Sequence, residues 1–197
     1  MIVSSFTTAG AVLAITGAYV FIVHLAWRIS WTEAIARTGL TLGAATWWLI
    51  SLAVLPLWLG YAWLSYGWMP IAAEDTGSSY HAILGQGLNA TTTTAAIAYG
   101  VISAGFGEEL LFRGLIGGAL ARRLGAWQAN TVQALVFLAP HLLILLVKPA
   151  AWFLLPGVFV LALLTGWLRI RSKSIGPGLI LHGVGNTLVG LLAAVGG

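Results

Sequence analysis

The sequence of 197 residues contains no cysteine, and Asp75 is its single aspartate. Without cysteine the chain cannot form a disulfide, use a thiolate nucleophile or bind a metal through sulfur. Charged residues of every kind make up only 7% of the chain, whereas soluble domains carry roughly 25%. So few charges cannot cover a surface that faces water. The composition therefore excludes an ordinary soluble protein.

Apolar residues take the place of the missing charge. They make up 59% of the chain, and the mean hydropathy is +0.96. In lipid the backbone must satisfy its own hydrogen bonds, so long apolar runs form helices. The ten tryptophans and five tyrosines are typical of aromatic belts at the two membrane surfaces. We assign five of the tryptophans to belt and lipid-facing positions: Trp47, Trp48, Trp58, Trp63 and Trp68.

The apolar runs predict an all-α, polytopic transmembrane helix bundle of about six spans, because a span needs roughly 20 residues. The expected spans are Thr8–Trp27, Gly43–Tyr66, Ala95–Leu120, Gln128–Val147, Ala150–Leu168 and Ile175–Val195. We predict a single membrane domain over residues 1–197. Residues 1–94 would supply two N-terminal spans and the polar loop Gly67–Thr93, and residues 95–197 would form a four-span catalytic core.

The basic residues between the spans predict the topology. With six spans, seven of them fall on one side of the membrane: Arg28, Arg37, Arg122, Arg123, Arg169, Arg171 and Lys173. Cytoplasmic loops carry the excess of lysine and arginine, so we expect both termini to be non-cytoplasmic. The formal net charge of +4 reflects these loops and does not indicate a nucleic-acid partner. We expect an integral protein of a bacterial or archaeal cell membrane.

A small set of polar residues lies inside the expected spans, where each charge costs about 2.5–3.5 kcal/mol on insertion scales. These residues are Glu108, Glu109, Arg113, His141, His182 and Asn186. Glu109 and Arg113 are four residues apart, as are His182 and Asn186, and His141 follows Phe137 by four; this spacing places two side chains on one helix face. At 1.5 Å per residue they lie roughly 10–20 Å from the basic loops, so one layer of the bundle can hold them all. Glycines on the same spans allow the close helix approach this requires.

The residue types in this layer indicate hydrolysis. A carboxylate and an imidazole can hold one water molecule and take its proton. A second histidine and an asparagine can donate hydrogen bonds to a developing oxyanion. Alternatively Glu108, His141 and His182 could bind one divalent metal such as Zn²⁺, which would activate the water. Both routes cleave an acyl bond, and the sequence leaves the choice between a metal and no cofactor open.

Three short motifs resemble those of a known family. Gly107-Glu108-Glu109-Leu110-Leu111-Phe112-Arg113-Gly114 resembles the E-E-x-x-x-R signature of the CAAX-protease and bacteriocin-processing (Abi) family, which includes the type II CAAX prenyl endopeptidases. Phe137-Leu138-Ala139-Pro140-His141 is similar to its F-x-x-x-H motif, and His182-Gly183-Val184-Gly185-Asn186 to its H-x-x-x-N motif. The three motifs occur in family order, each on an expected span, and the resemblance covers about residues 95–195.

This resemblance implies an intramembrane endopeptidase that acts on a membrane-associated or prenylated protein or peptide, with the lipid bilayer as its surroundings. Glu108 would activate water that His141 shares, while His182 and Asn186 would form the oxyanion site. Glu109, Arg113 and Phe137 would be supporting residues. Family members are described both as metalloenzymes and as metal-free glutamate enzymes, so the resemblance leaves the metal open as well.

Other intramembrane protease classes fit the sequence less well. A serine rhomboid needs a G-x-S-x-G-like nucleophile on a span, a site-2 enzyme needs H-E-x-x-H, and an aspartyl enzyme needs two membrane aspartates; the chain has none of these. Two other function classes stay open. The buried Glu, Arg and His residues could form a proton or ion relay in a small transporter. The chain could also be a non-catalytic membrane partner, such as an immunity or scaffold protein that keeps the fold.

Overall fold

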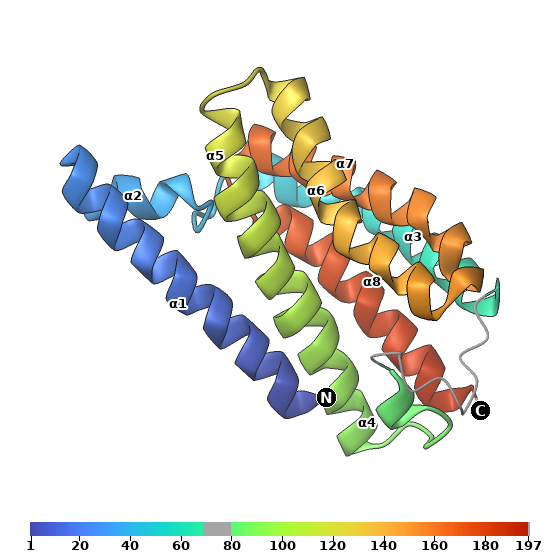
Figure 1. The fold of residues 1–197 in the computed structure, drawn as a ribbon. Helices are drawn as coiled ribbons and strands as arrows, with labels where there is room; N and C mark the ends of the chain where they lie inside the picture. The colour runs from blue at the N-terminus through green and yellow to red at the C-terminus, as the bar shows by residue number, and fades with distance from the viewer. Residues whose placement is uncertain (69–79, 197) are drawn as a thin grey trace.

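A computed structural model describes residues 1–68 and 80–196, and these residues are helical with no β-strand. Six helical segments are long and apolar enough to cross a membrane: Ile2–Trp27, Ala45–Ser65, Ala90–Ala121, Ala126–Leu146, Ala151–Ser172 and Gly176–Val195. The predicted all-α bundle of about six spans is therefore confirmed. Its helices run alongside one another, with the polar third span near the middle (Figure 1).

Within the described residues, nine helical elements build the six spans. The first and second spans are α1 (Ile2–Trp27) and α3 (Ala45–Trp68), and the short helix α2 (Trp31–Arg37) lies between them. The third span joins α4 (Ala90–Ile97), the π-helix η2 (Ala98–Gly117) and α5 (Gly118–Ala121). The others are α6 (Ala126–Val147), α7 (Leu155–Ser172) after the 3₁₀ segment η3 (Pro149–Leu154), and α8 (Gly176–Val195). The 3₁₀ turn η1 (His81–Ile83) precedes the third span.

Several helix ends differ from the prediction. The third span begins at Ala90 rather than Ala95, because Asn89 caps it: the Asn89 side chain accepts from the backbone N–H groups of Thr91 and Thr92 at 2.9 and 3.0 Å. The end of the predicted loop Gly67–Thr93 is therefore helical, while residues 69–79 of that loop lie outside the described residues. Helix α1 also begins six residues earlier than expected, at Ile2.

Helices η2 and α8 form the tightest pair, and glycines make this possible. A Cβ added at Gly105 would lie 2.9 Å from the Gly183 Cα, and one added at Gly100 would lie 2.8 Å from the Gly183 carbonyl oxygen. The two backbones are thus in direct contact, as the small residues on these spans predicted. Helix α1 packs on one side of η2, α3 packs on α8, and α6 pairs with α7.

The π-helical part of the third span was not predicted. Its backbone bonds connect residues five apart, a rare geometry that is frequent at functional sites. Residues four and five apart therefore share its buried face, which runs through Gly100, Gly105, Glu109 and Arg113. This face lies against α8 and α1, so the polar residues of η2 lie inside the bundle rather than against lipid.

The basic segments meet at one end of the bundle. The Arg122 Nη2 donates to the Tyr19 hydroxyl at 2.6 Å, and the Arg169 Nη2 donates to the Arg37 carbonyl at 3.1 Å. Both chain termini lie at the opposite end (Figure 1). This arrangement agrees with six spans, and the assignment of the termini to the non-cytoplasmic side stays a prediction.

The belt assignment of the tryptophans is partly wrong. Trp63 is exposed, as expected. Trp47 packs edge-on against Trp167 with ring centroids 5.2 Å apart, and both belong to the apolar cluster around Leu168. Trp58 packs in the same cluster and lies over Gly185 of α8. The side chain of Trp68 lies outside the described part of the chain. Trp47 and Trp58 are half-buried because α3 packs against α7 and α8.

Candidate active site

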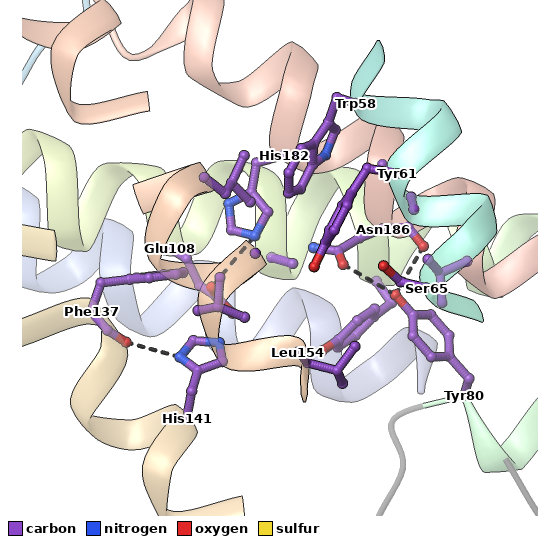
Figure 2. Close-up of a pocket in the computed structure, with 18 of the residues that line it drawn as sticks. Trp58, Tyr61, Ser65, Tyr80, Glu108, Phe137, His141, Leu154, His182 and Asn186 are labelled. Carbon is purple, nitrogen blue, oxygen red and sulfur yellow. Dashed lines mark hydrogen bonds and ion pairs between the residues drawn. The ribbon is translucent and has the colours of Figure 1, made fainter. Parts of the chain in front are cut away.

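A cavity of about 270 Å³ lies inside the bundle, and residues from α3, η2, α6, α7 and α8 form its walls. Four predicted catalytic residues line it: Glu108, His141, His182 and Asn186. Phe137 lines it as well. Figure 2 shows the Glu108 carboxylate between the rings of His182 and His141. The structure therefore brings together residues that the sequence places on three different spans.

The two adjacent glutamates occupy different surroundings. Glu109 is fully buried and forms an ion pair with the equally buried Arg113, with 3.3 Å between Oε1 and Nη1. The Arg113 guanidinium also lies over the Phe137 ring, 4.0 Å from its centroid. Glu108 keeps 31% of its side chain accessible and faces the cavity. Of the two carboxylates, Glu108 is thus the one that can contact a water molecule or a substrate.

Glu109 also orients His182. Its Oε1 lies 3.0 Å from the His182 Nδ1. A carboxylate only accepts, so the Nδ1 nitrogen must donate. The Nε2 nitrogen then faces the cavity, 3.7 Å from the Glu108 Oε2. The buried contacts from Arg113 to Glu109 and from Glu109 to His182 therefore determine which imidazole nitrogen points into the cavity.

His141 is oriented by its own helix. Its Nδ1 lies 2.8 Å from the Phe137 carbonyl oxygen, which can only accept, so Nδ1 is the donor. The Nε2 of the neutral ring is then an acceptor. Pro140 lies inside α6 and lacks a backbone N–H, which interrupts the regular bonding of this turn. The Phe137 ring contacts both imidazoles, with centroids 4.7 Å from His141 and 5.9 Å from His182.

Tyr80 contacts the site from the segment before the third span, and the sequence analysis missed it. Its hydroxyl donates to the Asn186 backbone carbonyl at 2.9 Å and lies 3.4 Å from the Asn186 Oδ1. Burial raises the pKa of Tyr80 well above its usual value, and the nearby Tyr99 and Glu108 raise it further. The hydroxyl therefore keeps its proton and stays a donor at neutral pH. Figure 2 shows this contact beside the cavity.

Helix α3 supplies a further wall that no motif indicated. Trp58, Tyr61 and Ser65 all line the cavity. They lie three and four residues apart, which is the spacing of one helix face. The sequence did not single these residues out, because the same helix carries other aromatic residues that do not line the cavity, such as Trp47 and Trp63.

The residues present do not form a ready three-ligand metal site. Among the residues that the structure describes, no group of three or more His, Asp or Glu side chains is arranged to hold a metal ion. The Nδ1 nitrogens of His182 and His141 donate to Glu109 and to a carbonyl, and this leaves Nε2 available on each ring, as in metal-binding histidines.

Comparison with known proteins identifies the family. A family model described as type II CAAX prenyl endopeptidase Rce1-like matches residues 90–188, half of the chain. This range contains all three motifs, from Glu108 to Asn186. No curated protein and no solved structure gave a significant match. The match confirms the resemblance drawn from the motifs, and the chain belongs to the Rce1-like family of type II CAAX prenyl endopeptidases, which are intramembrane proteases.

Proposed function

We propose that this protein hydrolyses a peptide bond of a membrane-associated or prenylated protein or peptide, with Glu108 as the catalytic base. The observation that carries the proposal is the position of Glu108, an accessible carboxylate facing a buried cavity that both histidines also line. A purely structural role accounts for Glu109, which is buried and paired, but leaves Glu108 without a function.

In the first step a water molecule is held between the Glu108 carboxylate and the His141 Nε2. Both groups are acceptors, so they can bind the two hydrogens of one water and leave its oxygen directed at the substrate carbonyl. Glu108 takes one proton as the oxygen attacks the carbonyl carbon. The tetrahedral intermediate then expels the amine, which leaves with the proton that Glu108 had taken.

The oxyanion would be bound by His182 and Asn186. Because Nδ1 of His182 donates to Glu109, Nε2 can donate only when the ring is an imidazolium. Protonated His182 and Arg113 would then balance the two carboxylates, Glu108 and Glu109. A buried cluster of zero net charge avoids the cost of an uncompensated charge. Such donors aimed at a developing charge are usually the largest single contribution to catalysis.

Tyr80 would act as a positioning residue for Asn186. Its hydroxyl bond to the Asn186 carbonyl and its proximity to Oδ1 hold the carboxamide in place. With Oδ1 turned toward Tyr80, the Nδ2 donor is directed to the other side, and Figure 2 shows the amide beside His182. The apolar part of the cavity wall, which includes Ile144, Leu154 and Leu161, suits the hydrocarbon portion of a substrate.

The test compares wild type with Glu108→Gln, expressed at matched levels in the native host, by mapping peptide termini across the membrane proteome. We expect termini that depend on Glu108. Glu33→Gln is the matched control, because Glu33 lies on α2 with 53% of its side chain exposed and does not line the active-site cavity. Cleavage that persists in Glu108→Gln would refute the assigned base. Identical termini in all three strains would favour the non-catalytic or ion-relay functions.

A chelator separates the two water-activation routes. Incubating purified protein with a strong divalent-metal chelator should leave its peptidase activity within about twofold of the untreated value, because Glu108 and His141 suffice for the base. Loss of activity that returns on adding Zn²⁺ would show that a metal activates the water instead.

A further inference from the structure

The basic end of the bundle contains a second cavity, of about 430 Å³, that is separate from the active-site cavity. It lies between α2, the end of the third span and the end of α7. Four cationic side chains line it: Arg37, Arg122, Arg169 and Lys173. The one carboxylate in its lining is Glu33, which forms an ion pair with Arg37 at 2.8 Å. Three positive charges therefore remain unbalanced within the lining.

Two guanidinium groups converge above Gly118. The position that a Cβ of Gly118 would take is 3.5 Å from the Arg122 Nη1 and 3.7 Å from the Arg169 Nη2. Glu33, the carboxylate of the lining, forms its ion pair with Arg37, and neither Arg122 nor Arg169 forms an ion pair with it. Like charges this close repel unless an anion lies near both. Planar guanidinium groups bind phosphate oxygens through paired N–H donors.

Donors in this lining are buried without an acceptor. The Arg37 Nη1 and the Arg169 Nε have no hydrogen-bond partner among the described residues, although neither atom is open to solvent. Buried polar groups are normally hydrogen-bonded, and leaving one unpaired is costly. Oxygen atoms of a ligand entering the cavity could satisfy donors on the same guanidinium groups.

The surroundings of the cavity indicate where such a ligand would come from. Helix α2 supplies part of the cavity wall, and on α1 and α2 the side chains of Trp27, Trp31 and Ile35 are 54%, 48% and 39% exposed. The Arg37 guanidinium lies 4.5 Å from the centroid of the Trp27 ring, which connects this apolar surface to the cationic cavity. Tryptophans at the end of a span are typical of the membrane surface. Basic pockets between transmembrane helices at that level bind anionic lipid headgroups.

We propose that this cavity binds the phosphate group of an anionic phospholipid, with Arg122 and Arg169 as the principal ligands and Lys173 at the rim. The headgroup phosphate would lie between the two guanidinium groups, and the acyl chains would lie along α1 and α2. A soluble phosphate would offer the same oxygens without the apolar part. The proposal does not depend on the proteolytic function.

The test measures thermal unfolding of the purified full-length protein in detergent with added phosphatidylglycerol, phosphatidylcholine or inorganic phosphate at equal concentrations. We expect phosphatidylglycerol to raise the unfolding midpoint by about 5 °C, as a ligand well above its Kd does. Phosphatidylcholine should raise it far less. An equal effect of both lipids would overturn the proposal, as would no effect of any phosphate probe. If inorganic phosphate raises the midpoint as much as phosphatidylglycerol does, the cavity binds phosphate but does not require a lipid.

Single substitutions test whether the lipid acts at this cavity. Arg122→Gln should weaken the apparent affinity for phosphatidylglycerol by about tenfold, the usual effect of losing a charge-assisted bond of about 1.4 kcal/mol. Arg123→Gln is the matched control, because the neighbouring residue does not line the cavity. Tyr19→Phe controls for the lost Arg122–Tyr19 bond. Equal weakening by Arg123→Gln would show diffuse attraction to a basic surface and would overturn the site.

Discussion

Replacing Arg113 with alanine should destabilise the fold much more than replacing Glu108 with glutamine. Arg113 and Glu109 are both fully buried and form an ion pair at 3.3 Å. Removing one partner leaves the other charge buried without compensation, which costs about 3–5 kcal/mol. It also removes the cation from the Phe137 ring. Glu108 is partly accessible, and glutamine keeps its shape, so Glu108→Gln should cost less than about 1 kcal/mol.

Thermal unfolding of the purified variants, followed by tryptophan fluorescence, measures this difference. For a chain of this size about 1 kcal/mol shifts the midpoint by roughly 2–4 °C. We therefore expect Arg113→Ala to lower the midpoint by roughly 6–20 °C and Glu108→Gln by no more than about 4 °C. Equal midpoints for the two variants would refute the assignment of Glu109 and Arg113 as the supporting pair.

A double variant separates loss of charge pairing from loss of packing. Glu109→Gln combined with Arg113→Met removes both charges and keeps most of the side-chain volume. Replacing both members of a buried pair is often close to neutral, so the double variant should recover at least half of the midpoint lost in Arg113→Ala. It should nevertheless have little peptidase activity, because Glu109 no longer fixes the His182 ring. No recovery would show that packing, rather than charge, dominates the cost.

Two further predictions concern contacts from outside the motifs and between helices. Tyr80→Phe should lower kcat about three- to tenfold with little change in KM, which is the effect of losing one hydrogen bond of about 1 kcal/mol. If Tyr80 acts through Asn186, the same substitution should have no further effect on kcat in an Asn186→Ala background. Gly105→Ala should lower the unfolding midpoint, because the added Cβ would lie 2.9 Å from the Gly183 Cα. Gly107→Ala is the control and should leave the midpoint unchanged, because the atom nearest to its Cβ would be 3.5 Å away. Equal shifts of the midpoint in the two variants would contradict the close packing of η2 against α8.

The spans could be predicted because lipid imposes one dominant rule on the sequence. An apolar run of sufficient length becomes a helix, so the number of spans follows from hydropathy alone. Helix ends depend on local bonds instead. The capping box at Asn89 extends the third span to Ala90 through side-chain bonds to Thr91 and Thr92, residues that the prediction had placed in the polar loop.

The polar residues of the site could be placed on their spans because charge is expensive in lipid and its few positions are informative. Tyr80 could not be found this way. It lies outside the spans, and its contact with Asn186 joins residues 106 positions apart. Tyrosine is also expected at membrane surfaces for other reasons. Only the folded arrangement distinguishes this tyrosine from one at the lipid boundary.

The neighbouring glutamates show how one motif separates two functions. Adjacent positions on a helix point in different directions, so Glu109 can face Arg113 and His182 while Glu108 faces the cavity. Glu109 is unavailable as a base because its charge is used to hold Arg113 and to orient His182. Glu108 is of little use to the fold because its side chain is partly accessible and its nearest charged neighbour is 3.7 Å away. If Glu108 is the base as proposed, a substitution should remove activity at one position and stability at the next, so comparing activity with unfolding at both positions tests the whole arrangement.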